Sequence, residues 1–251
     1  MKDIKIKTKR EIELMRKAGA FLKSVMDFLV SETKAGMRKI DLDKLADEKI
    51  RSLDCKPGFL GYRGFPKTLI VCKNDEIVHG IPNEDILNEG DLVTFDLGLI
   101  YKGFYSDKAV SFVLGGGEKN KLARDLIKRT EEAFFSALEF CKEGFILNDI
   151  SKAIEKVAKK YNLGIVKETT GHGIGKKLHE DPLIFNFSNF DSSDELKEGM
   201  VFAIEPIFTL GSPKFRQKDD GWTLVTEDGS ISAHYENTVL IKKNGYEVLT
   251  L

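Results

Sequence analysis

The chain has 251 residues, of which 41% are hydrophobic and 31% are charged, as expected for a folded protein with a sizeable core. Its 39 basic and 40 acidic residues give a formal charge of -1, which provides no global reason to expect nucleic acid or an anionic membrane as a partner. No apolar leader and no run of about 18 apolar residues occurs, so we expect neither a secretory signal nor a membrane-spanning helix.

The three cysteines, Cys55, Cys72 and Cys141, are scattered along the chain. Their odd number and the lack of a CxxC pair argue against a disulfide framework and against a cysteine-based zinc site. We therefore expect free thiols and a cytoplasmic protein.

Two amphipathic helices are expected at the start of the chain. Thr8 is followed three residues later by Glu11, the spacing of a capping box, and apolar residues then recur at helical spacing. The first helix is expected to end near Gly36. Asp41 is expected to cap a second helix that runs to about Leu53.

Residues 69–114 contain β-prone runs punctuated by Gly and Asn, which predict strands within 69–72, 91–97 and 109–114. Two further amphipathic helices are expected at about 119–142 and 148–161, with Asn148 as the N-cap of the second. The rest of the chain returns to short predicted strands, at 164–169, 200–209, 222–226, 231–240 and 245–250.

The order of elements is helices, strands, helices, strands, which predicts an α+β fold and not an alternating βαβ series. Without a linker or a change of composition, we expect one domain over residues 1–251. Each strand block also carries two acidic residues inside apolar runs, Asp96 with Asp107 and Glu205 with Glu236. This weak internal repeat suggests two pseudo-symmetric halves with a site between them.

Asp96 and Asp107 flank a turn candidate at 101–103, so the segment predicts a hairpin in which they lie opposite or one diagonal step apart. Such neighbours have Cβ atoms roughly 4.5–8 Å apart. Two carboxylates at that distance repel each other unless a cation lies between them. The alternative is one solvent-facing Asp at a turn and one cap.

Glu205 interrupts an apolar run, and a buried carboxylate needs a partner or a metal because its desolvation costs many kcal/mol. The alternative is an exposed Glu on an edge strand, which the neighbouring Pro206 permits. Glu236, considered alone, is more typical of an exposed strand residue. His234 beside it is expected on the surface of a strand and is assigned no role.

His172 is framed by glycines, which remove side-chain bulk and let the backbone approach a ligand, whereas an isolated His is more often structural or exposed. Four carboxylates and one imidazole suit manganese, iron, cobalt or zinc better than thiolate-preferring metals. The four negative charges match two divalent ions, which at about 3.5–4 Å apart can share a bridging hydroxide.

Several short stretches, taken together and in this order, carry a resemblance to a known family: 61–66 (GYRGFP), 78–82 (VHGIP), 91–96 (DLVTFD), 171–175 (GHGIG), 178–180 (LHE), 202–206 (FAIEP) and 235–238 (YENT). From about residue 3 to its end, the chain resembles the type I methionine aminopeptidases. The resemblance implies the pita-bread α+β fold, with two pseudo-symmetric halves around a dinuclear metal site.

The resemblance also implies an activity. Two divalent ions (cobalt, manganese, iron, zinc or nickel) would be held by Asp96, Asp107, His172, Glu205 and Glu236. The implied reaction removes the N-terminal methionine of nascent polypeptides, favouring a small second residue. The implied enzyme is a monomer without membrane or specific nucleic-acid partners; a transient ribosome contact stays open.

A mechanism follows as a hypothesis. A bridging hydroxide attacks the carbonyl, and the free α-amine of the substrate ligates one metal. Glu205 shuttles the proton to the leaving amine. His179 donates a hydrogen bond to the developing oxyanion, and His79 steadies the scissile amide.

The specificity pocket is expected to be apolar and rich in aromatic residues, which suits a methionine thioether. By position in the resemblance its lining is Phe59, Tyr62, Phe65, Ile70, Leu178 and Trp222, together with His79 and His179. Phe59 and Ile70 stand where cysteines are frequent in the bacterial enzymes, and Leu178 where an aromatic is frequent. The alternative for each apolar member is ordinary core.

Two other functions remain in view. An X-prolyl aminopeptidase or prolidase shares the fold and the five ligands, but usually carries an additional N-terminal domain, for which this chain has no room. A non-catalytic binding module of the same fold would be expected to have lost ligands, and all five are present here.

Overall fold

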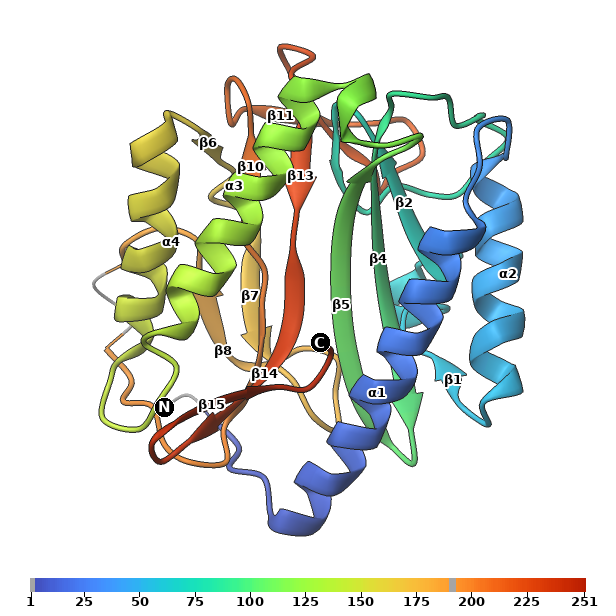
Figure 1. Cartoon of the computed structure of the whole chain (residues 1–251). Coiled ribbons are helices and arrows are strands. Elements are labelled where there is room, and N and C mark those ends of the chain that lie inside the picture. The colour runs from blue at the N-terminus through green and yellow to red at the C-terminus, as the bar shows by residue number, and fades with distance from the viewer. Residues whose placement is uncertain (1–2, 190–192) are drawn as a thin grey trace.

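Four α-helices lie along one face of an antiparallel sheet in the computed structural model, which describes residues 3–189 and 193–251 (Figure 1). Within these residues the helices are α1 (Lys9–Glu32), α2 (Lys39–Ser52), α3 (Lys121–Leu138) and α4 (Leu147–Tyr161). Two short 3-10 turns, η1 (Tyr62–Gly64) and η2 (Gly117–Lys119), accompany them. The expected sequence of helices, strands, helices and strands is confirmed, and with it the α+β class.

The main sheet has nine strands among the described residues, in the order β1-β4-β5-β14-β9-β7-β8, with β2 beside β4 and β15 beside β14. Their bounds are β1 (Lys56–Pro57), β2 (Leu69–Lys73), β4 (Leu92–Tyr101), β5 (Phe104–Val113), β7 (Thr170–Gly173), β8 (Glu180–Phe185), β9 (Val201–Ile204), β14 (Glu236–Lys242) and β15 (Gly245–Val248). Two three-stranded sheets complete the described part. One joins β13 (Ser232–His234), β10 (Ile207–Thr209) and β6 (Gly164–Ile165); the other joins β11 (Phe215–Gln217), β12 (Leu224–Thr226) and β3 (Glu76–Val78).

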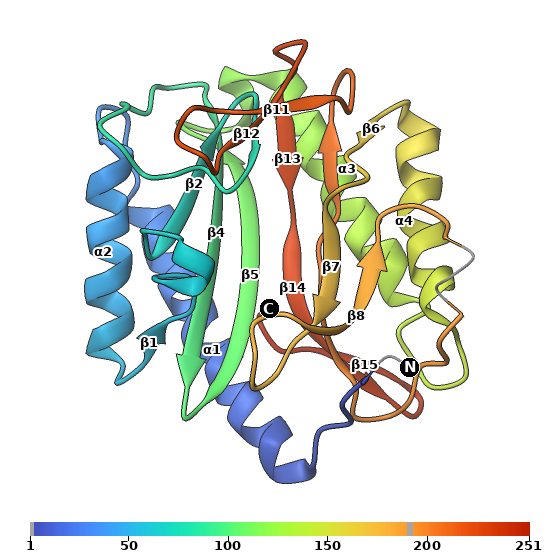
Figure 2. The same cartoon turned by 180° about the vertical axis from the view of Figure 1, so that it is seen from behind.

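Strand β14 joins two halves of the molecule. It pairs with β5 on one side and with β9 on the other, so strands far apart in the sequence become neighbours. Helices α1 and α2 lie over the β4–β5 half, and α3 and α4 lie over the other half (Figure 1). In the view from behind no α-helix lies in front of the sheet, and the short 3-10 turn η1 lies there near β2 (Figure 2).

The capping box at the start of α1 is confirmed. The Thr8 hydroxyl accepts a hydrogen bond from the backbone N–H of Glu11, and the Glu11 carboxylate accepts one from the backbone N–H of Thr8. The helix ends at Glu32, a turn before the expected Gly36, because Thr33 adopts an extended backbone.

The other two predicted caps are wrong. The α2 N-cap is Arg38, and Asp41 lies inside the first turn, where its carboxylate binds the Arg38 guanidinium. Helix α4 begins one residue before Asn148, whose side-chain carbonyl instead accepts a hydrogen bond from the backbone N–H of Asn189. Both residue types also bind groups outside a cap, so sequence position alone does not fix their partner.

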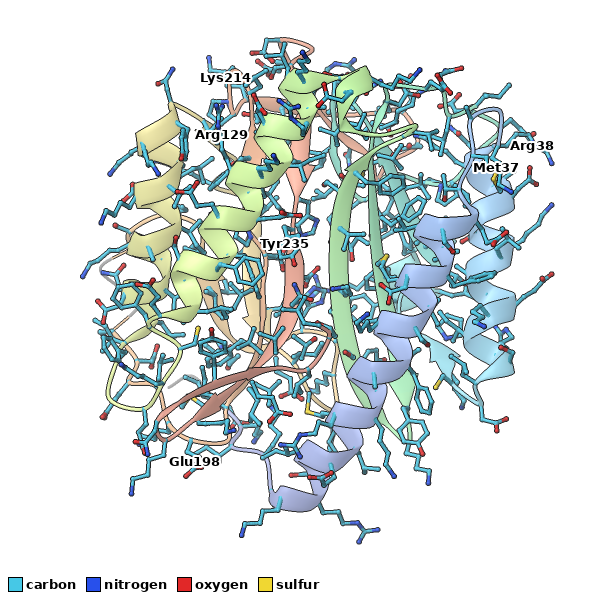
Figure 3. The ribbon with its side chains drawn as sticks, in the orientation of Figure 1. Met37, Arg38, Arg129, Glu198, Lys214 and Tyr235 are labelled. Carbon is cyan, nitrogen blue, oxygen red and sulfur yellow. The ribbon has the colours of Figure 1, made fainter. Side chains whose placement is uncertain are left out.

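Two predicted strands are broken at matching points. The run 200–209 divides into β9 and β10 at Glu205-Pro206, and the run 231–240 divides into β13 and β14 at Tyr235. The two breaks lie side by side, since the Tyr235 N–H donates to the Pro206 carbonyl. The Tyr235 ring lies beneath α3 (Figure 3), its centroid 5.3 Å from that of Phe134. The chain therefore passes from the main sheet to a smaller one here.

Other strand expectations hold only in part. Strands β1, β3, β7, β8 and β11 were not predicted, and only the first two residues of the run 164–169 are extended in a sheet. All three cysteines are free and buried, as expected. Among the described residues, no helix is both long enough and apolar enough to cross a membrane.

Gly19, in the middle of α1, is required by packing and not by its backbone angles. A Cβ built on Gly19 would lie 2.1 Å from the Leu249 carbonyl oxygen, which belongs to the segment that follows β15. Glycine therefore lets the C-terminal segment rest directly on the helix backbone, at the usual cost of glycine inside a helix.

We expect Gly19→Ala to lower the free energy of unfolding by about 1–3 kcal/mol, because the new methyl group must displace the Leu249 carbonyl. Urea unfolding followed by circular dichroism measures this change. Ser24→Ala, on the exposed face of the same helix, is the matched control and should leave stability unchanged within about 0.5 kcal/mol. A Gly19→Ala protein as stable as the parent would show that this contact is unimportant.

Candidate metal centre

The β4–β5 hairpin brings Asp96 and Asp107 together. Asp96 pairs with Ala109 across the ladder, and Asp107 pairs with Gly98, so the two aspartates are one diagonal step apart on the same face. This is one of the two arrangements that the spacing around the 101–103 turn predicts. Both side chains are buried.

Glu205 and Glu236 come from the other half of the molecule. Glu205 lies in the break between β9 and β10, and Glu236 is the first residue of β14. Their side chains are 13% and 3% exposed, so an exposed position is wrong for both. The pairing of β14 with β5 places Glu236 opposite Ala109, which is also the partner of Asp96. All four carboxylates therefore meet where the halves join.

His172, on β7, points its ring into the same cluster. Its Nδ1 lies 2.9 Å from the Gly173 carbonyl oxygen, and its Nε2 lies 3.8 Å from Asp107 Oδ2 and 3.7 Å from Glu205 Oε1. A ring that donates from Nδ1 to a carbonyl keeps an Nε2 lone pair for a metal.

The glycines around His172 have a different purpose from the one expected. A Cβ on Gly171 would lie 2.5 Å from the Ala203 carbonyl oxygen, and one on Gly173 would lie 2.1 Å from that of Asp181. They allow close approach of the neighbouring chain segments on either side.

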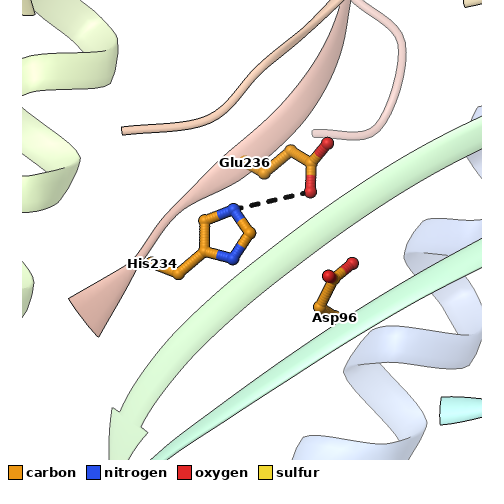
Figure 4. A group of neighbouring side chains, drawn as sticks. All are labelled: Asp96, His234 and Glu236. Carbon is orange, nitrogen blue, oxygen red and sulfur yellow. Dashed lines mark ion pairs between the residues drawn. The ribbon is translucent and has the colours of Figure 1, made fainter. Parts of the chain in front are cut away.

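His234 is the residue that sequence reasoning missed. It was expected on the surface, but it is only 2% exposed, and its Nε2 lies 3.6 Å from Glu236 Oε2 and 3.9 Å from Glu205 Oε2 (Figure 4). One signal was present: residues two apart on a strand share a face, so His234 and Glu236 belong together if Glu236 points inward.

Burial controls the protonation of the cluster. It raises the pKa of Asp96 to about 7, and burial together with the neighbouring carboxylates holds the pKa values of Asp107, Glu205 and Glu236 well above their usual range. Burial lowers the pKa of His172 to about 4 and that of His234 to about 3, so both rings are neutral at pH 7.

The donor atoms fit metal ions. Two groups each place three ligand atoms within 4.8 Å of one another: Asp96, His234 and Glu236 form one, and Asp107, His172 and Glu236 form the other. Asp96 Oδ1, Glu236 Oε1 and His234 Nε2 are buried without a hydrogen-bond partner. Buried polar atoms without partners are costly, and divalent cations would satisfy these.

The cluster opens into a cavity of about 370 Å³. Its lining includes all eight residues expected to contact substrate: Phe59, Tyr62, Phe65, Ile70, His79, Leu178, His179 and Trp222. Phe65 and Trp222 pack edge to face with centroids 5.2 Å apart. The apolar members pack together in one hydrophobic cluster and also line the cavity. The two interpretations offered for them, core residue and pocket lining, are therefore both correct. Arg63 also lines the cavity and was not expected there.

The two remaining histidines lie at the mouth. The His179 ring centroid is 4.3 Å from that of His172, and its Nδ1 is 2.7 Å from the Tyr62 hydroxyl. His79 has a left-handed backbone (φ 58°), and its ring is 6.3 Å from that of Trp222. A positive φ is unfavourable for a non-glycine residue and is often found at functional sites.

The sequence matches the model of metallopeptidase family M24 over residues 13–243. It is 42% identical over 246 residues to a methionine aminopeptidase of Clostridium perfringens, and the match covers 98% of each chain.

The structure is similar to that of the methionine aminopeptidase from Rickettsia prowazekii, with a TM-score of 0.95, 36% identity and coverage of 99% and 100% of the two chains. It is also similar to a prolidase from Pyrococcus furiosus, with a TM-score of 0.78 and 26% identity. That match covers 98% of this chain and 65% of the prolidase chain. These likenesses confirm the pita-bread α+β fold.

The protein freed of metal is expected to lose stability as the pH rises. Burial raises the pKa of Asp96 from 3.8 to about 7, so between these values the folded state holds a proton that the unfolded state has released. The free energy of unfolding should therefore fall as the pH rises, by up to about 1.4 kcal/mol per pH unit for each such proton. Below pH 6.5 the buried histidines oppose this fall, because they are neutral in the folded state and charged in the unfolded one. Thermal unfolding in chelator between about pH 6.5 and about pH 8 therefore measures the carboxylates alone.

Asp96→Asn is the control, because it removes one of the titrating groups and should flatten the dependence. Stability of the parent that rises steadily with pH over the same window would contradict the placement of these carboxylates in a buried cluster.

Proposed function

Because the chain belongs to metallopeptidase family M24, and to the methionine aminopeptidases within it, we propose that it removes the N-terminal methionine of polypeptides. The observation that carries the proposal is the convergence of four carboxylates, three of them buried and Glu205 13% exposed, and neutral imidazoles in the lining of a cavity that also has many apolar and aromatic residues. Neither half of the chain makes this arrangement alone.

Two divalent ions are proposed to be held by Asp96, Asp107, His172, Glu205 and Glu236, where the charges of four carboxylates and two cations cancel. Such ions supply Lewis acidity, which polarises a carbonyl and makes water deprotonate near neutral pH. The donor set is compatible with cobalt, manganese, iron, zinc or nickel.

The apolar side of the cavity is proposed to bind the methionine side chain. Phe65 and Trp222 present ring edges and faces, and Tyr62 and Phe59 lie on the same wall. A thioether gains from such aromatic contacts. With its side chain there, the first residue of a peptide would have its carbonyl next to the carboxylate cluster, which lines the same cavity.

His179 is proposed to stabilise the developing oxyanion. Partial burial and the nearby His172 and Arg63 lower its pKa, so the ring is neutral at pH 7 and has one donor nitrogen. If the Tyr62 hydroxyl donates to Nδ1, the proton must be on Nε2, which then donates into the cavity. Tyr62 is therefore proposed to select the tautomer that His179 needs.

Glu205 is proposed to carry the proton to the leaving amine. Among the glutamates of the cluster, its side chain is the more accessible, at 13% exposed against 3% for Glu236. Burial raises its pKa, which brings a carboxyl group closer to the range useful for proton transfer at neutral pH. His79, which also lines the cavity, is proposed to steady the scissile amide.

The physiological substrates are proposed to be new polypeptides with a small second residue, processed by a cytoplasmic monomer. This rests on the likeness to the methionine aminopeptidases.

The metal dependence and the substrate are tested together. Protein stripped with chelator should not hydrolyse Met-Ala-Ser, and re-addition of a single divalent metal should restore methionine release. Gly-Pro should not be cleaved under any of these conditions, because its first residue, glycine, has no side chain to occupy the apolar side of the cavity. Cleavage of Gly-Pro in preference to Met-Ala-Ser would favour an X-prolyl peptidase instead.

His179→Ala should lower kcat for Met-Ala-Ser by about 10²–10³, since it removes a donor to the oxyanion, while KM and metal content change little. His179→Gln, which keeps an N–H donor, should recover part of the loss and serves as the conservative variant. An unchanged kcat in His179→Ala would exclude this role.

A further inference from the structure

His234 is a buried histidine without a partner. Its Nε2 makes no hydrogen bond, its side chain is 2% exposed, and the ring faces the carboxylates of the cluster (Figure 4). Nε2 lies 3.6 Å from Glu236 Oε2 and 3.9 Å from Glu205 Oε2, both too long for a hydrogen bond. The ring is therefore in the site without being bonded to it.

These separations are close to those of two ligands on one metal ion. With metal–nitrogen and metal–oxygen bonds of about 2.0–2.2 Å, ligand atoms at ordinary angles are roughly 3.0–3.5 Å apart. Glu236 is the nearer co-ligand by this measure. Asp96 completes a group of three ligand atoms with His234 and Glu236, all within 4.8 Å of one another.

The backbone of His234 is fixed in a way that aims the ring inward. The Ser111 hydroxyl accepts a hydrogen bond from the His234 N–H at 3.0 Å and donates to the His234 carbonyl at 2.8 Å. Thr94 holds that hydroxyl in turn, with the two side-chain oxygens 2.7 Å apart. Both contacts come from β4 and β5, the hairpin that carries Asp96 and Asp107. The position of the His234 imidazole is thus fixed relative to the hairpin that carries Asp96 and Asp107.

We propose that His234 is a sixth protein ligand, so that each of the two metal ions has one imidazole. The two groups of donors share Glu236 and are otherwise matched, Asp107 with His172 and Asp96 with His234. Glu205 lies between the rings, with Oε1 3.7 Å from His172 Nε2 and Oε2 3.9 Å from His234 Nε2. This inference deepens the proposed function and rests on it.

The added ligand has a chemical consequence. A neutral imidazole adds a donor without changing the charge, which the four carboxylates already balance. Without His234, the ion beside Asp96 would have only oxygen ligands, a set that suits manganese or magnesium. With His234 that ion gains a nitrogen ligand, which favours cobalt, nickel or zinc. Its affinity for these metals should therefore depend on His234.

The test compares metal binding by the full chain and two variants. After removal of metal, cobalt(II) is titrated and followed by calorimetry and by the visible absorption of the bound ion. The parent should bind two ions. His234→Gln should bind the first unchanged and the second at least about 10-fold more weakly. The loss should be larger for cobalt or zinc than for manganese. His79→Gln, which removes a cavity histidine outside both donor groups, should bind both ions like the parent.

A measurement on the parent protein guards against a variant that folds poorly. X-ray absorption of the protein loaded with two cobalt ions counts imidazoles per ion. His172 and His234 together give an average of one per ion, whereas His172 alone gives one half.

Either of two results would overturn this inference and leave the proposed function intact. One is an average of half an imidazole per bound ion in the parent. The other is an affinity for the second metal ion that is unchanged in His234→Gln. A parent chain that binds no divalent metal would overturn both.

Discussion

The repulsion among four buried carboxylates is the interaction on which the arrangement of this molecule depends. Asp96 and Asp107 come from one hairpin, Glu205 and Glu236 from the other half, and all four meet where β5, β14 and β9 lie side by side. Burial raises the pKa values of all four, and neighbouring carboxylates raise those of Asp107, Glu205 and Glu236 further. Such a cluster needs protons or cations to offset its charge, and it lies at the joint between the two halves.

The joint is fixed by hydrogen bonds that span most of the chain. The Thr238 hydroxyl accepts from the Asp107 N–H at 3.0 Å and donates to the Asp107 carbonyl at 2.9 Å. Next to it, the Asn237 side-chain carbonyl accepts from Lys108 Nζ at 2.6 Å and from the Thr250 hydroxyl at 2.8 Å. These bonds place β5 against β14 directly behind two of the carboxylates, the position from which supporting residues orient metal ligands.

The substrate side of the cavity is built from loops that rest on the same strands. Gly98 on β4 makes room for Phe59, since a Cβ at position 98 would lie 2.6 Å from the Phe59 ring. The aromatic wall and the carboxylate wall are thus joined through β4. A substitution that changes the shape of the aromatic lining at Phe59 is therefore expected to shift β4 close to Asp96. Substrate preference and metal binding thus depend on the same strand.

The sequence by itself determined the local features: the Thr8 cap, the β4–β5 hairpin and the diagonal placement of Asp96 and Asp107, because each depends on residues a few positions apart. It also indicated which acidic residues interrupt apolar runs. Only the tertiary structure decided that Glu236 and His234 are buried. Which face a strand residue presents depends on pairing partners more than a hundred residues away, such as Ala109 for Glu236.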